Sequence, residues 1–453
     1  MKKKLYILYC AVFFAVCLIP FVGMAWQDGS EVVANEVKVQ MPEISSDDGF
    51  NPEYFDQLTQ YIDRNFAGRQ TLITINGLLM KNLGESGNEK VIQGKDGWLF
   101  FEETAKDYLG QATISRREAF AIAENLQTVK LGVESRGGRF FFTIAPNKNS
   151  LYGQYMPSRY VANRSESNYA LIEPYLDESY YVDLFDALGS GDEILYHKWD
   201  SHWTRAGALA ARDALMEAAG KSARDYSDVS SKEQRRHRGD LYEMAFPKSR
   251  ALDWDTVYDA EPEYTYVRAV NSDDEPLIET RSEKKGSLVM YRDSFGIALL
   301  PFMADEYGKA FFSKETPYNL DAAADYMPGD VVIELVERNL AQLCEEAPIM
   351  SAPVTKEIPS ERKNASEVSG EITLTEEDGY LKIEGSIDED MVDTESRYWI
   401  QVRTADGSQI YAPFYVGESG FVLRLADLTA EDVREVIWYC GDEEAMIKVS
   451  KAF

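Results

Sequence analysis

The stretch "SLVMYRDSFGIALL" (residues 287–300) places an apolar run, a short polar turn and a second apolar run in direct succession. Residues 287–291 form a short, almost continuously apolar run, which is typical of a strand buried on both faces, and residues 296–307 have helical spacing. A buried strand that leads at once into a helix predicts an α/β fold with a parallel sheet. In such folds ligands bind at the carboxyl ends of the strands, so the turn at residues 292–294 is a candidate site.

The same alternation continues on both sides of this stretch. We expect further buried strands at 139–146, 181–186 and 330–335. Helical patterns lie at 114–135, 204–219 and 336–346. Together they predict a three-layer α/β domain with a mainly parallel sheet, which we place at residues 51–350.

The character of the chain changes after this region. Residues 351–369 read as a polar linker, and residues 370–453 hold several period-2 strands separated by turn residues. This pattern predicts a small antiparallel β-sandwich. A second unit also fits the length of 453 residues, which is more than one ordinary core accommodates.

The N-terminus has the features of a membrane segment. Three lysines (residues 2–4) precede the uncharged run Leu5–Trp26, which as a helix is about 33 Å long and therefore spans a bilayer. The lysines predict a cytoplasmic N-terminus. We expect a single-pass anchor over residues 1–26 and a polar stalk over 27–50. A cleaved signal peptide, with Gly23–Met24–Ala25 as the cleavage site, is the alternative.

Composition limits the classes of partner. A formal net charge of −30 repels nucleic acid, so no nucleic-acid partner is expected. The same charge argues mildly against a strongly anionic substrate. Of the four cysteines, Cys344 and Cys440 lie outside the apolar segment, and either a disulfide or two free buried thiols is compatible with the sequence.

Ser294 stands at the strand-to-helix turn, where a serine is exposed at the edge of the sheet. Its own N–H, and those of the first helical turn, are unpaired in a regular helix and suit an oxyanion. The alternative is that Ser294 only caps the helix.

A base for this serine is suggested by "DSHWT" (residues 200–204). A neutral imidazole can accept the proton of a hydroxyl nucleophile, and a carboxylate can orient that imidazole. His202 and Asp200 supply these groups in a loop ahead of a helix. A packed or surface His202 is the alternative, and a metal site formed with His197 matches no zinc signature, so no metal is expected. We expect His197 in a packing or substrate-side position, and His237, among arginines, on the surface.

The two motifs together resemble the SGNH hydrolase-like domain of the alginate O-acetyltransferase (AlgX/AlgJ-like) family. Asp200, His202, Trp203, Thr204 and Gly207 match its first block, and Asp293–Ser294–Phe295 matches its second. Four further segments look like motifs of that family: "GKDGWLFF" (94–101), "APNKNSLY" (145–152), "RGDL" (238–241) and "DVVIELVERNL" (330–340).

By this resemblance Ser294 is the nucleophile, His202 the general acid/base and Asp200 its orienting carboxylate. The implied reaction moves an acetyl group through an acyl-serine onto a cell-surface or extracellular polysaccharide. A multi-pass membrane acyltransferase is the implied donor, and no cofactor is implied. Lys148, Arg292 and Trp203 are candidate oxyanion or substrate contacts. Arg292 stands where the family often has a small residue.

Two other functions remain open on the sequence alone. A secreted carbohydrate acetyl esterase uses the same three residues, with water as the acceptor. A catalytically idle surface protein that binds glycans through the C-terminal sandwich is the second.

Overall fold

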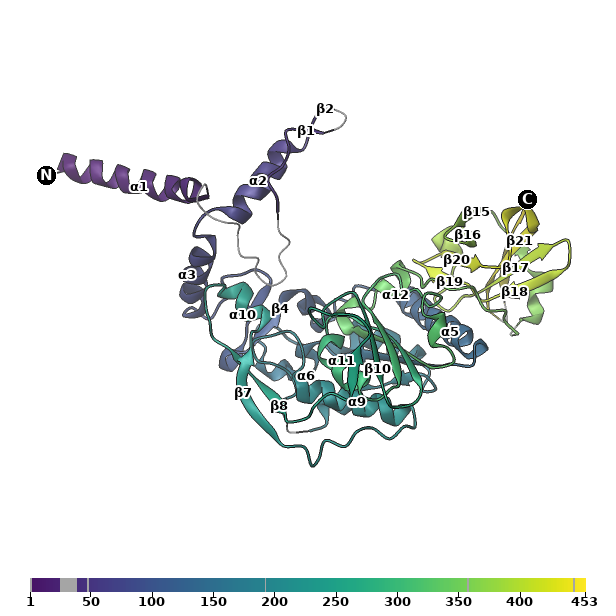
Figure 1. Cartoon of the computed structure of the whole chain (residues 1–453). Coiled ribbons are helices and arrows are strands. Elements are labelled where there is room, and N and C mark those ends of the chain that lie inside the picture. Colours follow the sequence, from purple (N-terminus) through teal and green to yellow (C-terminus); the bar gives the residue numbers. More distant parts are fainter. Residues whose placement is uncertain (1, 25–38, 47–48, 192, 357, 443–444) are drawn as a thin grey trace.

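A computed structural model of the chain describes residues 2–24, 39–46, 49–191, 193–356, 358–442 and 445–453 (Figure 1). Most of the segment that we interpret as a stalk therefore lies outside the described residues. Helix α1 (Lys2–Met24) extends away from the body of the molecule. Over Lys3–Met24 it is long and apolar enough to cross a membrane, a property that membrane anchors and signal sequences share.

A seven-stranded sheet forms the centre of the molecule, in the order β6-β5-β13-β11-β12-β10-β9. Its strands are β5 (Arg139–Ala145), β6 (Tyr181–Val182), β9 (Tyr264–Tyr266), β10 (Leu277–Ser282), β11 (Ser287–Tyr291), β12 (Lys309–Ser313) and β13 (Asp330–Val336). The first five strands in this order pair in parallel, and β10 and β9 add antiparallel pairs at one edge. The prediction of a mainly parallel sheet is confirmed.

Helices cover both faces of this sheet, and the alternation of side chains along its strands explains why. Phe140, Phe142 and Ile144 of β5 join the core on the side of α5 (Arg116–Ser135). Phe141 and Ala145 of the same strand join the core that contains α9 (Arg205–Ala218) and α11 (Gly296–Ala304). Because successive residues of a strand point to opposite faces, an apolar run fills both cores. The three-layer prediction is confirmed.

Two of the expected elements are shorter than predicted. The strand expected at 181–186 ends at Val182, because the Asp183 carboxylate accepts hydrogen bonds from the backbone N–H groups of Phe185 and Asp186 and starts α8 (Leu184–Gly189). The helix expected at 336–346 is reduced to a 3₁₀ turn and α12 (Gln342–Glu345).

The C-terminal strands form two facing sheets, β14-β22-β21-β17-β18 and β15-β16-β20-β19. Fully buried residues of both sheets, including Ile383, Leu423, Ile400 and Trp438, meet between them. Their strands are β14 (Ser366–Glu367), β15 (Glu371–Glu377), β16 (Tyr380–Ser386), β17 (Arg397–Thr404), β18 (Ser408–Tyr411), β19 (Phe414–Val416), β20 (Gly420–Leu425), β21 (Val433–Gly441) and β22 (Met446–Ala452). Cys344 and Cys440 are free, buried thiols.

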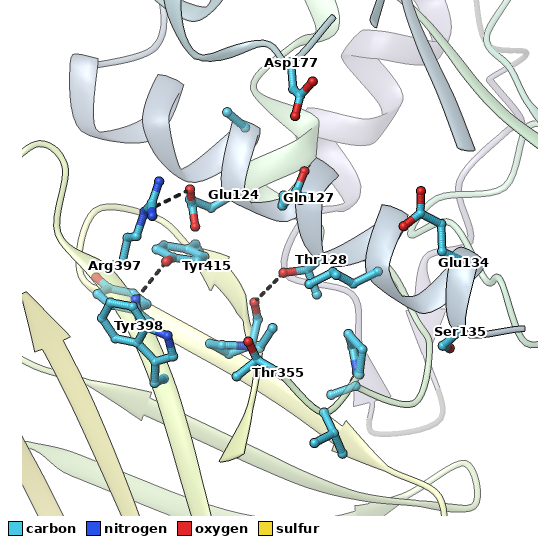
Figure 2. A pocket seen from close by; sticks show the side chains of 18 of the residues that line it. Glu124, Gln127, Thr128, Glu134, Ser135, Asp177, Thr355, Arg397, Tyr398 and Tyr415 are labelled. Carbon is cyan, nitrogen blue, oxygen red and sulfur yellow. Dashed lines mark hydrogen bonds and ion pairs between the residues drawn. The ribbon is translucent and has the colours of Figure 1, made fainter. Parts of the chain in front are cut away.

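Helix α5 joins this sandwich to the central sheet. The Arg117 guanidinium donates to the carbonyl of Ser396 at 2.7 Å, and the Asn125 side chain bonds both the N–H and the carbonyl of Tyr415. A cavity of about 1120 Å³ lies along this seam. Figure 2 shows that Thr128 bonds a carbonyl across the seam and that Arg397 pairs with Glu124.

The remaining elements are short or lie near the N-terminus. The strands are β1 (Ser45–Ser46), β2 (Gly49–Phe50), β3 (Val91–Gln93), β4 (Leu99–Phe101), β7 (Ser231–His237) and β8 (Asp253–Tyr258). The helices are α2 (Tyr54–Asn65), α3 (Arg69–Lys81), α4 (Ala105–Tyr108), α6 (Lys148–Tyr152), α7 (Asn168–Ile172) and α10 (Asp240–Ala245).

Candidate active site

The serine turn between β11 and α11 is held by the residue before the serine. One carboxylate oxygen of Asp293 accepts the Phe295 N–H at 2.8 Å, and the other accepts the Val336 N–H at the end of β13, also at 2.8 Å. Gly296 is required here because a Cβ at this position would lie 2.5 Å from the Cβ of Arg292. The turn is thereby fixed to the neighbouring strand.

The histidine loop lies just ahead of α9. The Thr204 hydroxyl caps α9 by accepting the Gly207 N–H, and the Asp200 carboxylate accepts the backbone N–H of His202 at 2.9 Å. These local bonds hold the His202 ring above Phe295, with ring centroids 4.7 Å apart.

The structure brings Ser294, His202 and Asp200 together. The Ser294 hydroxyl lies 2.8 Å from Nε2 of His202, and Nδ1 of His202 lies 2.6 Å from Oδ1 of Asp200. The structure does not place Ser294 as the cap of α11: the residue at the cap position is Phe295, and among the described residues no side chain caps this helix. The distances are those of a serine whose proton can pass to a carboxylate-oriented imidazole.

Charge and burial set the protonation of this group. Burial alone would raise the pKa of Asp200, but the charges and hydrogen bonds of His202 and His237 hold it well below its ordinary value. Burial would lower the pKa of His202, but the charge and hydrogen bond of Asp200 raise it above its ordinary value. The imidazole of His202 remains 24% exposed, so substrate can reach it.

The expectation that His237 is a solvated surface residue is wrong. Its Nε2 lies 2.8 Å from the second oxygen of Asp200, and its ring stacks on His197 at 3.8 Å. His197 is buried and packs against His237, which agrees with the first of its two expected positions, packing or substrate-side. The sequence around His237 does not indicate this position, because His237 reaches Asp200 only when the hairpin β7–β8 folds back onto the histidine loop. The signal available was the adjacent "RGDL" turn, where the Asp240 N–H also donates to Asp200 at 2.8 Å.

The oxyanion donors are fewer than predicted. The first-turn N–H groups are in use: that of Phe295 goes to Asp293, that of Gly296 to Glu334, and that of Ile297 to the carbonyl of Ser294. Within the described part of the chain, the N–H of Ser294 itself has no hydrogen-bond acceptor. It is the donor that this turn offers to a developing oxyanion.

Lys148 does not present its ammonium group as a substrate contact. It is buried and donates to the carbonyl oxygens of His197, Lys198 and Asp200, at 3.1, 3.4 and 2.5 Å. Burial lowers the pKa of Lys148 to about 8. The bonds instead hold the histidine loop in place.

Arg292 and Trp203 are also turned inward, each only 1% exposed. The Arg292 guanidinium donates to the carbonyls of Asp273 and Glu275. The indole N–H of Trp203 donates to the carbonyl of Phe295 at 3.0 Å. Both side chains support the site from behind rather than lining it.

A metal site was the other interpretation of this loop. Ligand atoms of Asp200, His202 and Asp240 lie within 4.8 Å of one another. Both oxygens of Asp200 already accept hydrogen bonds, and Asp240 accepts from the N–H and the hydroxyl of Ser201 at 2.8 and 2.6 Å. Because the oxygens of both carboxylates already accept N–H and O–H groups, this arrangement fits acid–base chemistry better than metal coordination.

Residues 91–289 match the model of the family described as SGNH hydrolase-like domain, acetyltransferase AlgX. The resemblance inferred from the motifs is confirmed over this range. It contains the histidine loop and ends just before the serine turn. No curated protein matches the chain.

Several solved structures are similar to part of the chain. A DHHW family protein from Eubacterium siraeum is 18% identical over 55% of this chain and 91% of its own, with a TM-score of 0.42. PatB1 from Bacillus cereus with a sulfonyl adduct is 16% identical over 55% and 95%, with a TM-score of 0.45. The O-acetyltransferase domain of Pseudomonas putida AlgJ is 17% identical over 55% and 92%, with a TM-score of 0.36. Likenesses this distant carry no information on activity.

Proposed function

We propose that this chain is an extracytoplasmic O-acetyltransferase that carries an acetyl group on Ser294. The observation that carries the proposal is the chain of hydrogen bonds from Ser294 through His202 to Asp200, at 2.8 and 2.6 Å. The match of residues 91–289 to an acetyltransferase family supports acyl transfer or ester hydrolysis as the class of reaction.

In the first half of the reaction, Nε2 of His202 takes the hydroxyl proton of Ser294 as Oγ attacks the carbonyl carbon of an acetyl ester. The negative charge that develops on the carbonyl oxygen is stabilised by the N–H of Ser294. The ester bond to the donor then breaks, and His202 returns the proton to the departing oxygen. An acetyl-serine remains.

In the second half, a sugar hydroxyl takes the place of the donor. His202 removes its proton, the hydroxyl oxygen attacks the acetyl carbon, and the bond to Oγ of Ser294 breaks. The proton returns to Ser294 through His202. Asp200 keeps Nδ1 of His202 protonated and stabilises the imidazolium in both halves.

The location and partners follow from the same proposal. Helix α1 would act as a single-pass anchor, with the remainder of the chain outside the membrane. A polysaccharide would be the acceptor, and a multi-pass membrane acyltransferase would deliver the acetyl group. A secreted acetyl esterase is the second candidate, because α1 also has the properties of a signal sequence and water can attack the same acetyl-serine.

The test uses the full chain in detergent with a fluorophosphonate probe and a chromogenic acetyl ester. Labelling and turnover that are lost in Ser294→Ala support the acyl-serine, whereas labelling and turnover unchanged in Ser294→Ala overturn it. Mass spectrometry of oligosaccharides added to the reaction then separates the two enzymes. Acetylated sugar identifies a transferase, and free acetate alone identifies an esterase.

A further inference from the structure

Asp200 receives an imidazole on each of its two oxygens. His202 lies 2.6 Å from Oδ1, and His237 lies 2.8 Å from Oδ2. Only 3% of Asp200 is exposed, so these imidazoles and the backbone N–H groups of His202 and Asp240 take the place of water around the carboxylate. Each oxygen accepts one imidazole N–H and one backbone N–H.

The ring of His237 is held in this direction by a second contact. It stacks on His197 with ring centroids 3.8 Å apart and an angle of 7° between the planes. His197 is itself fixed, since its Nδ1–H donates to the carbonyl of Trp254 at 2.9 Å and only 4% of the residue is exposed. The parallel stack keeps Nε2 of His237 pointed at Asp200.

We propose that His237 is a positioning residue for the reaction of Ser294, acting through Asp200. The inference rests on the proposed function and extends it to a fourth side chain. By occupying Oδ2, His237 leaves Oδ1 as the oxygen that orients His202. Rotation of the carboxylate, which would misdirect the His202 ring, then requires two charge-assisted hydrogen bonds to break.

The second consequence is electrostatic. The carboxylate charge of Asp200 is shared between two imidazoles, so a protonated His237 reduces the attraction that Asp200 exerts on a proton at His202. The charged and titratable groups facing His237 are Asp200 and His197 from the histidine loop, and Asp253 and Asp255 from β8. Burial would lower the pKa of His237, but the hydrogen bond and charge of Asp200 raise it above its ordinary value.

Two variants separate positioning from packing. His237→Phe keeps an aromatic ring against His197 but has no N–H for Asp200. His237→Gln lacks the ring and the titratable charge but places an amide N–H near the position of Nε2. Arg236→Ala, an exposed neighbour on the same strand, is the matched control.

The experiment measures kcat and KM of the full chain in detergent for a chromogenic acetyl ester across the pH range in which imidazole titrates. We expect His237→Phe to lower kcat by about tenfold to a hundredfold, with little change in KM, because a hydrogen bond to a charged group is lost. His237→Gln should recover most of this rate. Because glutamine brings no positive charge to Asp200, the His237→Gln variant should also move the acid limb of the pH profile to higher pH.

Equal rates in His237→Phe and wild type overturn the inference, as does a His237→Gln rate no better than that of His237→Phe. Thermal melting of each variant shows whether it is folded, and a variant that melts like wild type but is slow supports positioning. A wild-type chain with neither turnover nor Ser294 labelling contradicts the proposed function instead. The two failures are therefore distinguishable.

Discussion

Trp203 donates its indole N–H to the carbonyl of Phe295 at 3.0 Å and so ties the histidine loop to the serine turn. The two segments come from separate loops at the same edge of the sheet. The Trp203 ring also packs edge-on against Phe295, with centroids 5.1 Å apart. The separation of His202 and Ser294 therefore depends on a bond between their immediate neighbours.

Replacing Trp203 with Phe tests this bond. The smaller ring keeps part of the packing but removes the indole N–H that bonds the carbonyl of Phe295, which costs about 0.5–1.5 kcal/mol. We expect a lower free energy of unfolding in urea and a rate of Ser294 labelling by fluorophosphonate reduced several-fold. Wild-type stability together with a wild-type labelling rate would show that the bond is dispensable.

Asp200→Asn tests the role of the carboxylate. The amide has nearly the same shape, but it carries no charge and presents an N–H to one of the two imidazole N–H groups. Because the imidazolium of His202 then loses its counter-charge, kcat for an acetyl ester should fall on the order of a thousandfold or more. A loss smaller than tenfold, in a variant that melts like wild type, would exclude Asp200 as the orienting group.

A feature of this fold could be predicted from the sequence where it depends on a pattern within one short segment. Strands β5, β11 and β13 and helix α9 were predicted because continuous apolar runs and helical spacing are local patterns. Strand β12 was missed because its apolar part, residues 310–312, is only three residues long and gives too short a pattern to assign. His237 was misplaced for another reason, since only the long-range return of the β7–β8 hairpin brings it to Asp200.

The same distinction applies to the site. Ser294, His202 and Asp200 could be proposed from two short motifs, because each motif has a recognisable turn or loop context. The inward direction of Lys148, Arg292 and Trp203 could not, since exposure depends on how several distant segments pack. For each of these three, the tertiary contacts assign a supporting position where the family resemblance and the place in the sequence suggested a substrate contact.

Arg338 provides a test of the charge around His202. Its guanidinium lies over the rings of Phe101 and Phe295, at 5.5 and 5.6 Å, and its charge opposes protonation of His202. Removing the charge in Arg338→Gln should therefore raise the pKa of His202. Because the base must be neutral to accept the serine proton, the acid limb of kcat/KM should move to higher pH.

Arg338→Lys is the matched variant for this experiment, since it keeps the positive charge and loses the planar guanidinium. Its acid limb should remain close to that of wild type. A profile for Arg338→Gln that overlays the wild-type profile would show that the charge does not act on His202. A shift to lower pH would contradict the sign of the interaction.

Lys148 makes a prediction on stability rather than on rate. Burial lowers its pKa in the folded chain to about 8, below the ordinary value of 10.5, so between these two values the unfolded chain holds a proton that the folded chain has released. Stability contributed by this residue should consequently increase as pH rises through that window. Lys148→Met removes the titrating group and its hydrogen bonds to three carbonyl oxygens of the histidine loop, of which only that of Lys198 also accepts another backbone N–H among the described residues. The free energy of unfolding, measured in urea at several pH values, should be lower in Lys148→Met, and the gap to wild type should widen from about pH 8 upward. A gap that stays constant or narrows over this range would show that the ammonium group is not desolvated in the folded chain.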